Sequence, residues 1–234
     1  MTVASQAREY ERRYHEDLYG NHELFTPGTW LYKPAGYVIK AFDLVPKHDY
    51  PRVLDLGGGV GRHSIPAAKY FGADSEVVCV DLLESAIEKL RFNAKEHKVE
   101  KNIVGVVSDV ETYELGDKAY ELILSISCIE HIPTKQGVGD LIGRLQAATV
   151  LEGVHCFMMI TNNEWVDSVT GEKLTPLIEQ NLRSEDAISM LKELYAGWNI
   201  HDISAKDWEA MQLMDGRDVV LKSTCVQFTA QKSL

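Results

Sequence analysis

Hydrophobic runs and amphipathic stretches alternate along the chain from residue 52 onward. Runs rich in Val, Leu and Ile are typical of strands buried on both faces, and apolar residues at helical spacing between them predict amphipathic helices. The predicted strands are 52–56, 76–82, 102–109, 120–127 and 154–161, and the predicted helices between them are 63–71, 84–98 and 140–151. Strands joined by helical crossovers in this way predict a parallel, doubly wound α/β sheet.

The chain ends in two further strand-like runs, 198–204 and 218–230. The polar stretch between them is too short for a crossover helix, so they predict an antiparallel pair. The sheet is therefore expected to have seven strands and to be mostly parallel.

Ahead of the sheet, residues 5–19 and 35–45 have helical character. The segment between them, 21–34, is rich in Pro, Gly and aromatic residues, and this composition predicts a loop. We therefore expect an N-terminal helical cap or lid over residues 1–50 and a cofactor-binding α/β domain over residues 51–234.

Composition narrows the class of protein. The chain has 234 residues and a net charge of −11, which disfavours nucleic acid as a partner because duplex binders carry a basic face. No apolar run approaches the roughly 20 residues of a membrane span, and the first residues have no signal-peptide core. We expect a cytoplasmic protein that does not bind membranes.

Its four cysteines show no CxxC pattern, so we expect neither a metal site nor disulfides.

Four glycines, Gly57, Gly58, Gly59 and Gly61, follow the first predicted strand. In an open parallel sheet the ligand binds beyond the carboxyl ends of the strands, and the first strand-to-helix turn is the usual place. The lysine of a phosphate-binding P-loop is missing, and the GxGxxG spacing of dinucleotide sites fits badly. The spacing present is GxGxG with Asp55 ahead of it, and a carboxylate there suits an ammonium group better than a pyrophosphate.

Four motifs follow in order along the predicted strands: residues 53–61, Asp81 at the end of the second strand, Asp109 after the third, and 125–133 after the fourth. In this combination the chain resembles the class I S-adenosylmethionine (SAM) dependent methyltransferases, over about residues 52–161. The segment 61–68, which follows the glycine turn, and the late segment 194–198 are similar to the tellurite-resistance methyltransferase branch of small-molecule enzymes.

The resemblance implies SAM as the cofactor and S-adenosylhomocysteine as the product. It implies that Asp81 accepts hydrogen bonds from both ribose hydroxyls, that Asp109 binds the adenine amino group, and that backbone carbonyls of 125–128 hold the methionine ammonium. The implied cofactor-binding residues are Asp55, Gly57, Gly58, Gly59, Arg62, Asp81, Leu82, Asp109, Val110, Ser125 and Ile126.

Several of these residues also have a structural interpretation. Asp55 either touches the ligand or holds the glycine loop, and Asp109 either binds adenine or caps a helix. Arg62 either reaches the methionine carboxylate or is a solvated side chain. Trp30 and Tyr32 either form a lid over the substrate or attach the N-terminal segment to the sheet.

The predicted function is transfer of a methyl group from SAM to a small-molecule nucleophile. A non-catalytic SAM-binding module for regulation or assembly is the alternative, and a nicotinamide dehydrogenase is the third hypothesis, disfavoured by the glycine spacing. The acceptor's identity and the oligomeric state stay open. We expect residues 1–50 and 162–183 to select the acceptor.

A general base for the acceptor has few candidates in the sequence. They are His131, Glu130, Tyr14 and Tyr19. His131 is the weak catalytic candidate, and a structural role in the turn after the fourth strand is favoured for it. An acceptor that arrives as a thiolate or an oxyanion needs no base.

Overall fold

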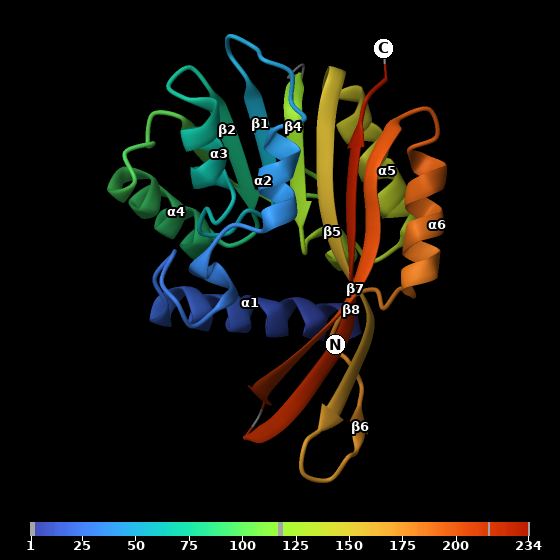
Figure 1. The fold of residues 1–234 in the computed structure, drawn as a ribbon. Coiled ribbons are helices and arrows are strands. Elements are labelled where there is room, and N and C mark those ends of the chain that lie inside the picture. Colours follow the sequence, from blue (N-terminus) through green and yellow to red (C-terminus); the bar gives the residue numbers. More distant parts are fainter. Residues whose placement is uncertain (1–2, 117–118, 215, 234) are drawn as a thin grey trace.

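The computed structural model describes residues 3–116, 119–214 and 216–233. Its sheet has the order β3-β2-β1-β4-β5-β8-β7, and the short strand β6 pairs with β5 off this path (Figure 1). β1 to β5 are parallel to one another, whereas β8 is antiparallel to both β5 and β7. The strands are β1 (Arg52–Leu56), β2 (Glu76–Asp81), β3 (Ile103–Val107), β4 (Tyr120–Ile126), β5 (Thr149–Asp167), β6 (Lys173–Leu174), β7 (Asn199–Met214) and β8 (Arg217–Gln231). The predicted doubly wound, mostly parallel sheet with its antiparallel C-terminal pair is confirmed, and the short strand β6 adds an eighth strand to the seven that were expected.

Helices cover both faces of the sheet. α2 (Gly36–Phe42), α3 (Ser64–Phe71) and α4 (Glu84–Glu96) share one hydrophobic core with the sheet. α5 (Lys135–Ala147) and α6 (Ser184–Leu194) share the other. All seven residues of β4 are buried, as the apolar pattern requires of a central strand with helices on both sides. Each large aliphatic side chain buried in this way contributes about 1.5–3 kcal/mol of hydrophobic stabilisation.

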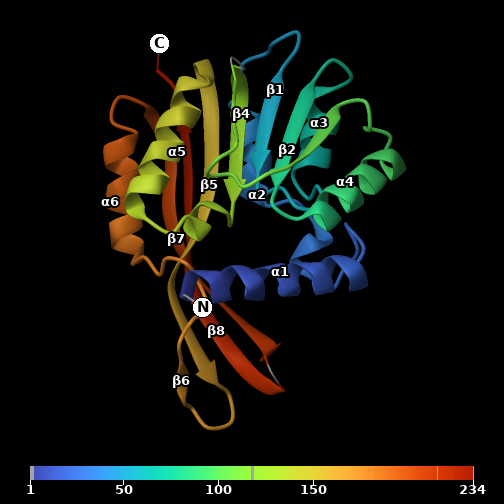
Figure 2. The same cartoon turned by 180° about the vertical axis from the view of Figure 1, so that it is seen from behind.

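α1 (Val3–Asn21) lies across the edge of the sheet where the parallel strands end, as both views show (Figures 1 and 2). It is followed by the short helix η1 (Trp30–Tyr32), and a second short helix, η2 (Ile129–His131), follows β4. The edge at which open parallel sheets bind their ligands is therefore covered by the N-terminal segment.

β5, β7 and β8 continue past α1 and form an antiparallel arm with β6 (Figure 1). The register joins Asp167 to Val219 in β5 and β8, and Met214 to Arg217 in β7 and β8. β5 and β7 extend well beyond the expected runs 154–161 and 198–204, whereas β8 exceeds the expected run 218–230 by only one residue at each end. The sequence does not reveal the added part of β7 because it is mostly exposed and lacks a continuous buried face.

Two helices differ from the expectation. α6 was not predicted, and α5 begins at Lys135 and ends at Ala147, so that residues 149–151 belong to β5 and not to a helix. No helix among the described residues is long and apolar enough to cross a membrane.

Candidate functional site

The glycine loop turns directly after β1, and its backbone is pinned to the neighbouring strand. The amide of Gly57 donates a hydrogen bond to the carbonyl of Val80, 2.8 Å away. Gly57 has φ +66°, and a Cβ on it would lie 2.7 Å from Cβ of Cys128. Gly57 is therefore required by close packing against Cys128, which is itself buried.

Asp55 lies behind this loop. Its carboxylate is 1% exposed and accepts a hydrogen bond of 2.6 Å from the hydroxyl of Ser64, at the start of α3. A Cβ on Gly58 would meet the same carboxylate at 2.8 Å. Burial raises the pKa of Asp55 to about 7 against the effect of the Ser64 hydrogen bond, with the nearby charge of Asp81 adding to the rise. This geometry supports the interpretation of Asp55 as the residue that holds the loop.

Asp81 and Gly59 form the corner at which β2 ends beside the loop. Oδ2 of Asp81 accepts a hydrogen bond from the amide of Gly59, and Oδ1 accepts one from the amide of Leu83, both at 2.9 Å. Gly59 has φ +55°, and a Cβ on it would lie 2.5 Å from the hydroxyl oxygen of Tyr19, on α1. Three of the four glycines accommodate packing inside the sheet domain, whereas the missing Cβ of Gly59 makes room for the hydroxyl of Tyr19 on α1.

The structure brings the other predicted residues to the same edge. Leu82 follows Asp81 and is 52% exposed, and Val110 is partly buried against the core behind the end of β3. Ser125 and Ile126 end β4 and are buried. The next residue, Ser127, has φ +54°, a conformation that a non-glycine residue adopts at a cost of about 1–2 kcal/mol. Strain of this kind collects at functional sites, which is consistent with the predicted role of this segment.

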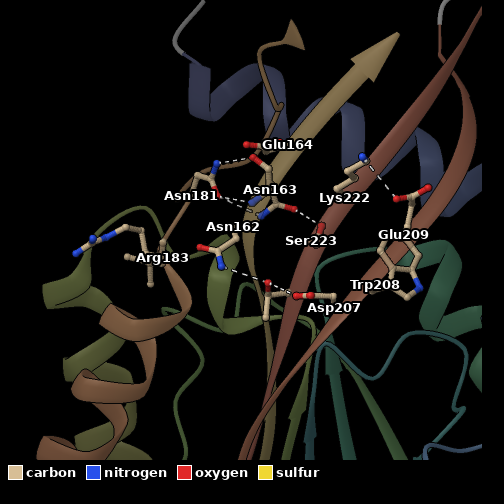
Figure 3. Close-up of a pocket in the computed structure, with 12 residues that line it drawn as sticks. Asn162, Asn163, Glu164, Asn181, Arg183, Asp207, Trp208, Glu209, Lys222 and Ser223 are labelled. Carbon is tan, nitrogen blue, oxygen red and sulfur yellow. Dashed lines mark hydrogen bonds and ion pairs between the residues drawn. The ribbon is translucent and has the colours of Figure 1, made fainter. Parts of the chain in front are cut away.

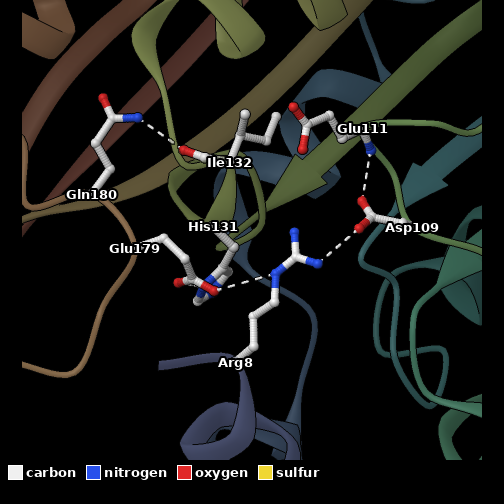
Figure 4. A network of polar contacts seen from close by, with 7 residues as sticks. All are labelled: Arg8, Asp109, Glu111, His131, Ile132, Glu179 and Gln180. Atoms are coloured by element: carbon white, nitrogen blue, oxygen red, sulfur yellow. Dashed lines mark hydrogen bonds and ion pairs between the residues drawn. The ribbon is translucent and has the colours of Figure 1, made fainter. Parts of the chain in front are cut away.

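A polar network joins α1 to the ends of two strands (Figure 4). Arg8 binds Oδ2 of Asp109 at 3.1 Å and approaches Oε1 of Glu179 at 3.9 Å. Oδ1 of Asp109 accepts a hydrogen bond from the amide of Glu111, so that Asp109 caps a turn and no helix begins there. Nδ1 of His131 lies 3.0 Å from Oε2 of Glu179. The two segments predicted to select the acceptor, 1–50 and 162–183, therefore meet beside η2.

His131 carries a proton at neutral pH. Burial opposes the charge, but the hydrogen bond to Glu179 and the carboxylates of Glu11 and Glu130 outweigh it and raise the pKa of His131 to about 9. The imidazolium therefore donates from Nδ1 to Glu179. A protonated ring cannot accept the proton of a substrate, so this site assigns His131 to holding the turn.

The other base candidates are also constrained. Oε1 of Glu130 accepts a hydrogen bond of 3.0 Å from the amide of Ile160, which ties η2 to β5. Burial raises the pKa of Glu130, of Tyr14 and of Tyr19. Both tyrosine hydroxyls are therefore neutral at ordinary pH, where they are donors and not bases.

Trp30 and Arg62 attach the N-terminal segment to the loop. Nε1 of Trp30 donates to the hydroxyl of Tyr14 at 3.3 Å, and the guanidinium of Arg62 lies over the Trp30 ring, 5.4 Å from its centroid. Nε of Arg62 donates to the carbonyl of Lys33 at 2.8 Å. Trp30 is 40% exposed and Tyr32 47% exposed. These contacts attach the N-terminal segment to the glycine loop. Movement of this segment as a lid over the substrate stays a prediction.

A hollow of about 690 Å³ lies elsewhere, between the start of α6 and the arm (Figure 3). The amide group of Asn181 exchanges hydrogen bonds with the backbone of Asn163, with distances of 2.8 and 2.9 Å. The hydroxyl of Ser223 donates to the side chain of Asn163 at 2.8 Å. This network fixes the segment that carries Glu179 to the arm. Within the described ranges, no group of three or more His, Cys, Asp or Glu side chains lies together as a metal site would require.

Comparison with known proteins agrees with this arrangement. Residues 47–212 match the family model described as a methyltransferase domain. The chain belongs to this family. The predicted resemblance to the class I SAM-dependent methyltransferases is therefore confirmed, and SAM is the cofactor that the family uses.

Individual relatives are distant or match only in part. The chain is 40% identical over 63 residues to a release factor glutamine methyltransferase of Dictyoglomus turgidum, covering 27% of this chain and 22% of that protein. It is 30% identical over 89 residues to the ubiquinone/menaquinone biosynthesis C-methyltransferase UbiE of Rhodopseudomonas palustris, covering 38% of this chain and 35% of that protein. The chain thus spans only about a fifth to a third of these curated relatives.

Solved structures share the fold. TehB of Haemophilus influenzae has a TM-score of 0.62 at 18% identity, covering 85% of this chain and 62% of TehB. A structure described for conversion of a disulfide bond into a thioacetal group during echinomycin biosynthesis has a TM-score of 0.63 at 15% identity, covering 95% and 92%. The branch predicted from residues 61–68 and 194–198 thus has a fold relative in TehB.

Proposed function

We propose that this protein is an enzyme that transfers the methyl group of SAM to a small-molecule nucleophile. The observation that carries the proposal is the corner formed by Asp81 and Gly59 at the carboxyl edge of the sheet. There, a buried carboxylate orders the loop, and the missing Cβ of Gly59 lets the hydroxyl of Tyr19 on α1 lie close to the loop. A carboxylate at a strand end beside a glycine loop suits the ribose of an adenosyl ligand, and the family match supports the choice of SAM.

In this proposal, different residues bind different parts of SAM. Asp81 holds the ribose, Asp109 lies at the adenine end, and the backbone of 125–128 faces the methionine portion. Asp55, Leu82, Val110 and Arg62 complete the proposed set, with Asp55 acting through the loop that it supports.

Bound SAM supplies a methyl group from a sulfonium, and because the sulfur departs as a neutral thioether, no acid is required to assist its departure. The protein contributes position, alignment and exclusion of water. His131, kept protonated by Glu179, fixes the turn at the end of β4, and α1 covers the edge. With His131 protonated and the tyrosines neutral, Glu130 is the one candidate base left, and its Oε1 is bound to the amide of Ile160. The site therefore favours an acceptor that is already anionic, such as a thiolate or an oxyanion.

The acceptor is a small molecule in this proposal because α1 encloses the edge. A protein or nucleic acid acceptor would need an open approach to the strand ends, and the net charge of −11 disfavours nucleic acid further. We also propose a cytoplasmic location. The cysteines Cys79, Cys128, Cys156 and Cys225 are free thiols, as is usual in a reducing compartment.

The proposal is tested by a methyl-acceptor screen with labelled SAM, using small thiols, metalloid oxyanions, amines and phenols. The expected result is formation of S-adenosylhomocysteine with a thiol or an oxyanion. Binding of SAM without turnover on any acceptor class would favour the alternative, a regulatory or assembly module.

A further inference from the structure

The face that α1 turns toward the sheet edge is unusual for a helix that covers a core. Amphipathic helices normally bury an apolar stripe at a spacing of three or four residues. Here Ala7 and Leu18 are buried, but Glu11 and His15 occupy the same stripe between them and are only partly exposed. Polar residues at these positions indicate that the helix faces something other than hydrophobic side chains.

His15 is held in one orientation. Its Nε2 lies 3.3 Å from Oε2 of Glu11, one helical turn away. Its ring lies beside that of Tyr19, with centroids 5.3 Å apart and planes tilted by 34°, and meets the ring of Trp30 edge-on at 6.0 Å. The carboxylate and the two aromatic rings therefore fix both the position and the rotation of the imidazole.

The second ring nitrogen of His15 has no protein partner. Nδ1 is buried, and no hydrogen-bond partner for it lies among the described residues. Buried polar atoms are nearly always paired, so an orphan of this kind indicates a partner from outside the chain.

Glu11 leaves one nitrogen of the ring for another partner. Its carboxylate engages Nε2, so that Nδ1 is the nitrogen that faces no group of the described chain. Burial works against ionisation of Glu11, but the hydrogen bond from His15 and the nearby His131 lower the pKa of Glu11, so the carboxylate is an acceptor for Nε2. An imidazole that carries its one proton on Nε2 has a lone pair on Nδ1, which accepts a hydrogen bond from a hydroxyl group.

The surroundings of His15 place it at the ribose end of the proposed cofactor site. Its neighbour Tyr19 points its hydroxyl at Gly59, where a Cβ would lie 2.5 Å away. Gly59 in turn is hydrogen-bonded to Asp81.

We propose that His15 is a cofactor-binding residue whose Nδ1 accepts a hydrogen bond from a ribose hydroxyl of SAM beside Asp81. Glu11 is the positioning residue that sets the ring. α1 is then one wall of the cofactor site as well as its cover. This inference rests on the proposed cofactor site and extends it to a residue outside the family motifs.

Two substitutions separate the hydrogen bond from the packing. His15→Phe keeps a ring against Tyr19 and Trp30 but removes the acceptor, whereas His15→Asn keeps an oxygen near the position of Nδ1. By calorimetry, His15→Phe is expected to bind S-adenosylhomocysteine about 3- to 10-fold more weakly, the range of one neutral hydrogen bond, and His15→Asn is expected to bind nearly as the natural protein does. His22→Phe, at an exposed histidine just after α1, is the matched control.

Ligand analogues make the assignment specific. Removal of the 2′- or the 3′-hydroxyl from S-adenosylhomocysteine should weaken binding to the natural protein. Removal of the hydroxyl that His15 holds should weaken binding less in His15→Phe than in the natural protein. A full, undiminished loss for both analogues in His15→Phe would overturn the inference. So would unchanged affinity accompanied by a collapse of kcat and loss of an ionisation near neutral pH, which would make His15 a general base.

A parallel measurement on Asp81→Ala distinguishes failure of the proposed cofactor site from failure of the role proposed for His15. If Asp81→Ala binds S-adenosylhomocysteine normally, the cofactor site itself is misplaced. If Asp81→Ala binds weakly and His15→Phe binds normally, the cofactor site stands and only the role of His15 is wrong.

Discussion

Nδ1 of His131 donates a hydrogen bond to Oε2 of Glu179 across 3.0 Å, joining the turn after β4 to a segment that lies 48 residues later in the chain. Arg8 on α1 approaches the other oxygen of the same carboxylate. One buried acid thus organises three parts of the molecule around the proposed site of methyl transfer. The predictions below test this arrangement and the cofactor corner beside it.

His131→Gln should lower kcat by about tenfold or less, because a group that is already protonated cannot act as the base. Loss of a general base would cost roughly 10²- to 10⁴-fold. The measurement is the pH–rate profile of both forms with a confirmed acceptor. A thousandfold loss together with the disappearance of an ionisation near neutral pH would identify His131 as the base.

The His131–Glu179 pair should also give stability that depends on pH. The folded-state pKa of His131, about 9, lies above its ordinary value of 6.5, so its contribution is complete below about pH 6.5 and is lost as the pH rises through 9. The free energy of unfolding of the natural protein should therefore exceed that of His131→Gln by roughly 1 kcal/mol at about pH 6, after allowance for solvent screening. The difference should shrink toward pH 9.5; a difference that grows with pH would show that the pair is not charged as described.

Asp81→Ala should weaken binding of S-adenosylhomocysteine at least about tenfold, because it removes a charged acceptor from the ribose and releases the amide of Gly59. Calorimetry measures the change. Asp74→Ala, at an exposed acid before the other end of β2, is the control and should bind normally. Equal affinity of both variants would mean that the ribose lies elsewhere.

Gly59→Ala should reduce cofactor binding and the melting temperature together, since its Cβ collides with the hydroxyl of Tyr19. Gly171→Ala separates crowding from backbone strain: Gly171 also has positive φ but has no atom within 4 Å of a Cβ. Adding Tyr19→Phe to Gly59→Ala should recover part of the melting temperature. No recovery would place the cost in the backbone alone.

Arg8→Ala should loosen α1, because it removes the contacts with Asp109 and Glu179. Hydrogen exchange of the α1 amides should rise about two- to fivefold, as expected for a largely exposed ion pair. Arg13→Ala is the control on the same helix, since Arg13 pairs with Glu9 within α1. Equal exchange in both variants would show that the bridge does not hold α1 in place.

The central fold was predictable from sequence because β1, β2 and β4 are buried along nearly their whole length, and because glycines follow β1 and an acid ends β2. α6 had a readable signal in the spacing of Ala187, Ile188, Leu191 and Leu194, which place an apolar stripe on one side of a helix. The arm had none. Residues 205–214 of β7 are mostly exposed and mix charged with apolar side chains, so no period of two marks them as a strand.

The residues of the site were likewise predictable from the sequence only in part. Gly59 and Asp81 follow from their positions after buried strands, whereas the packing of Gly57 against Cys128 depends on a contact between residues 71 positions apart. His15 lies on a helix whose register toward the sheet is set by tertiary contacts, and Glu179 lies in a segment without a motif. Spacing along the chain cannot reveal either residue.

The account is tested most directly by measuring S-adenosylhomocysteine and the methylated acceptor together, with labelled SAM and a panel of small thiols and oxyanions, for the natural protein and for Asp81→Ala. We expect the two products to form in equal amounts with the natural protein, and far more slowly with Asp81→Ala at limiting SAM. Tight binding of SAM by the natural protein without formation of S-adenosylhomocysteine from any acceptor class would contradict the proposed function.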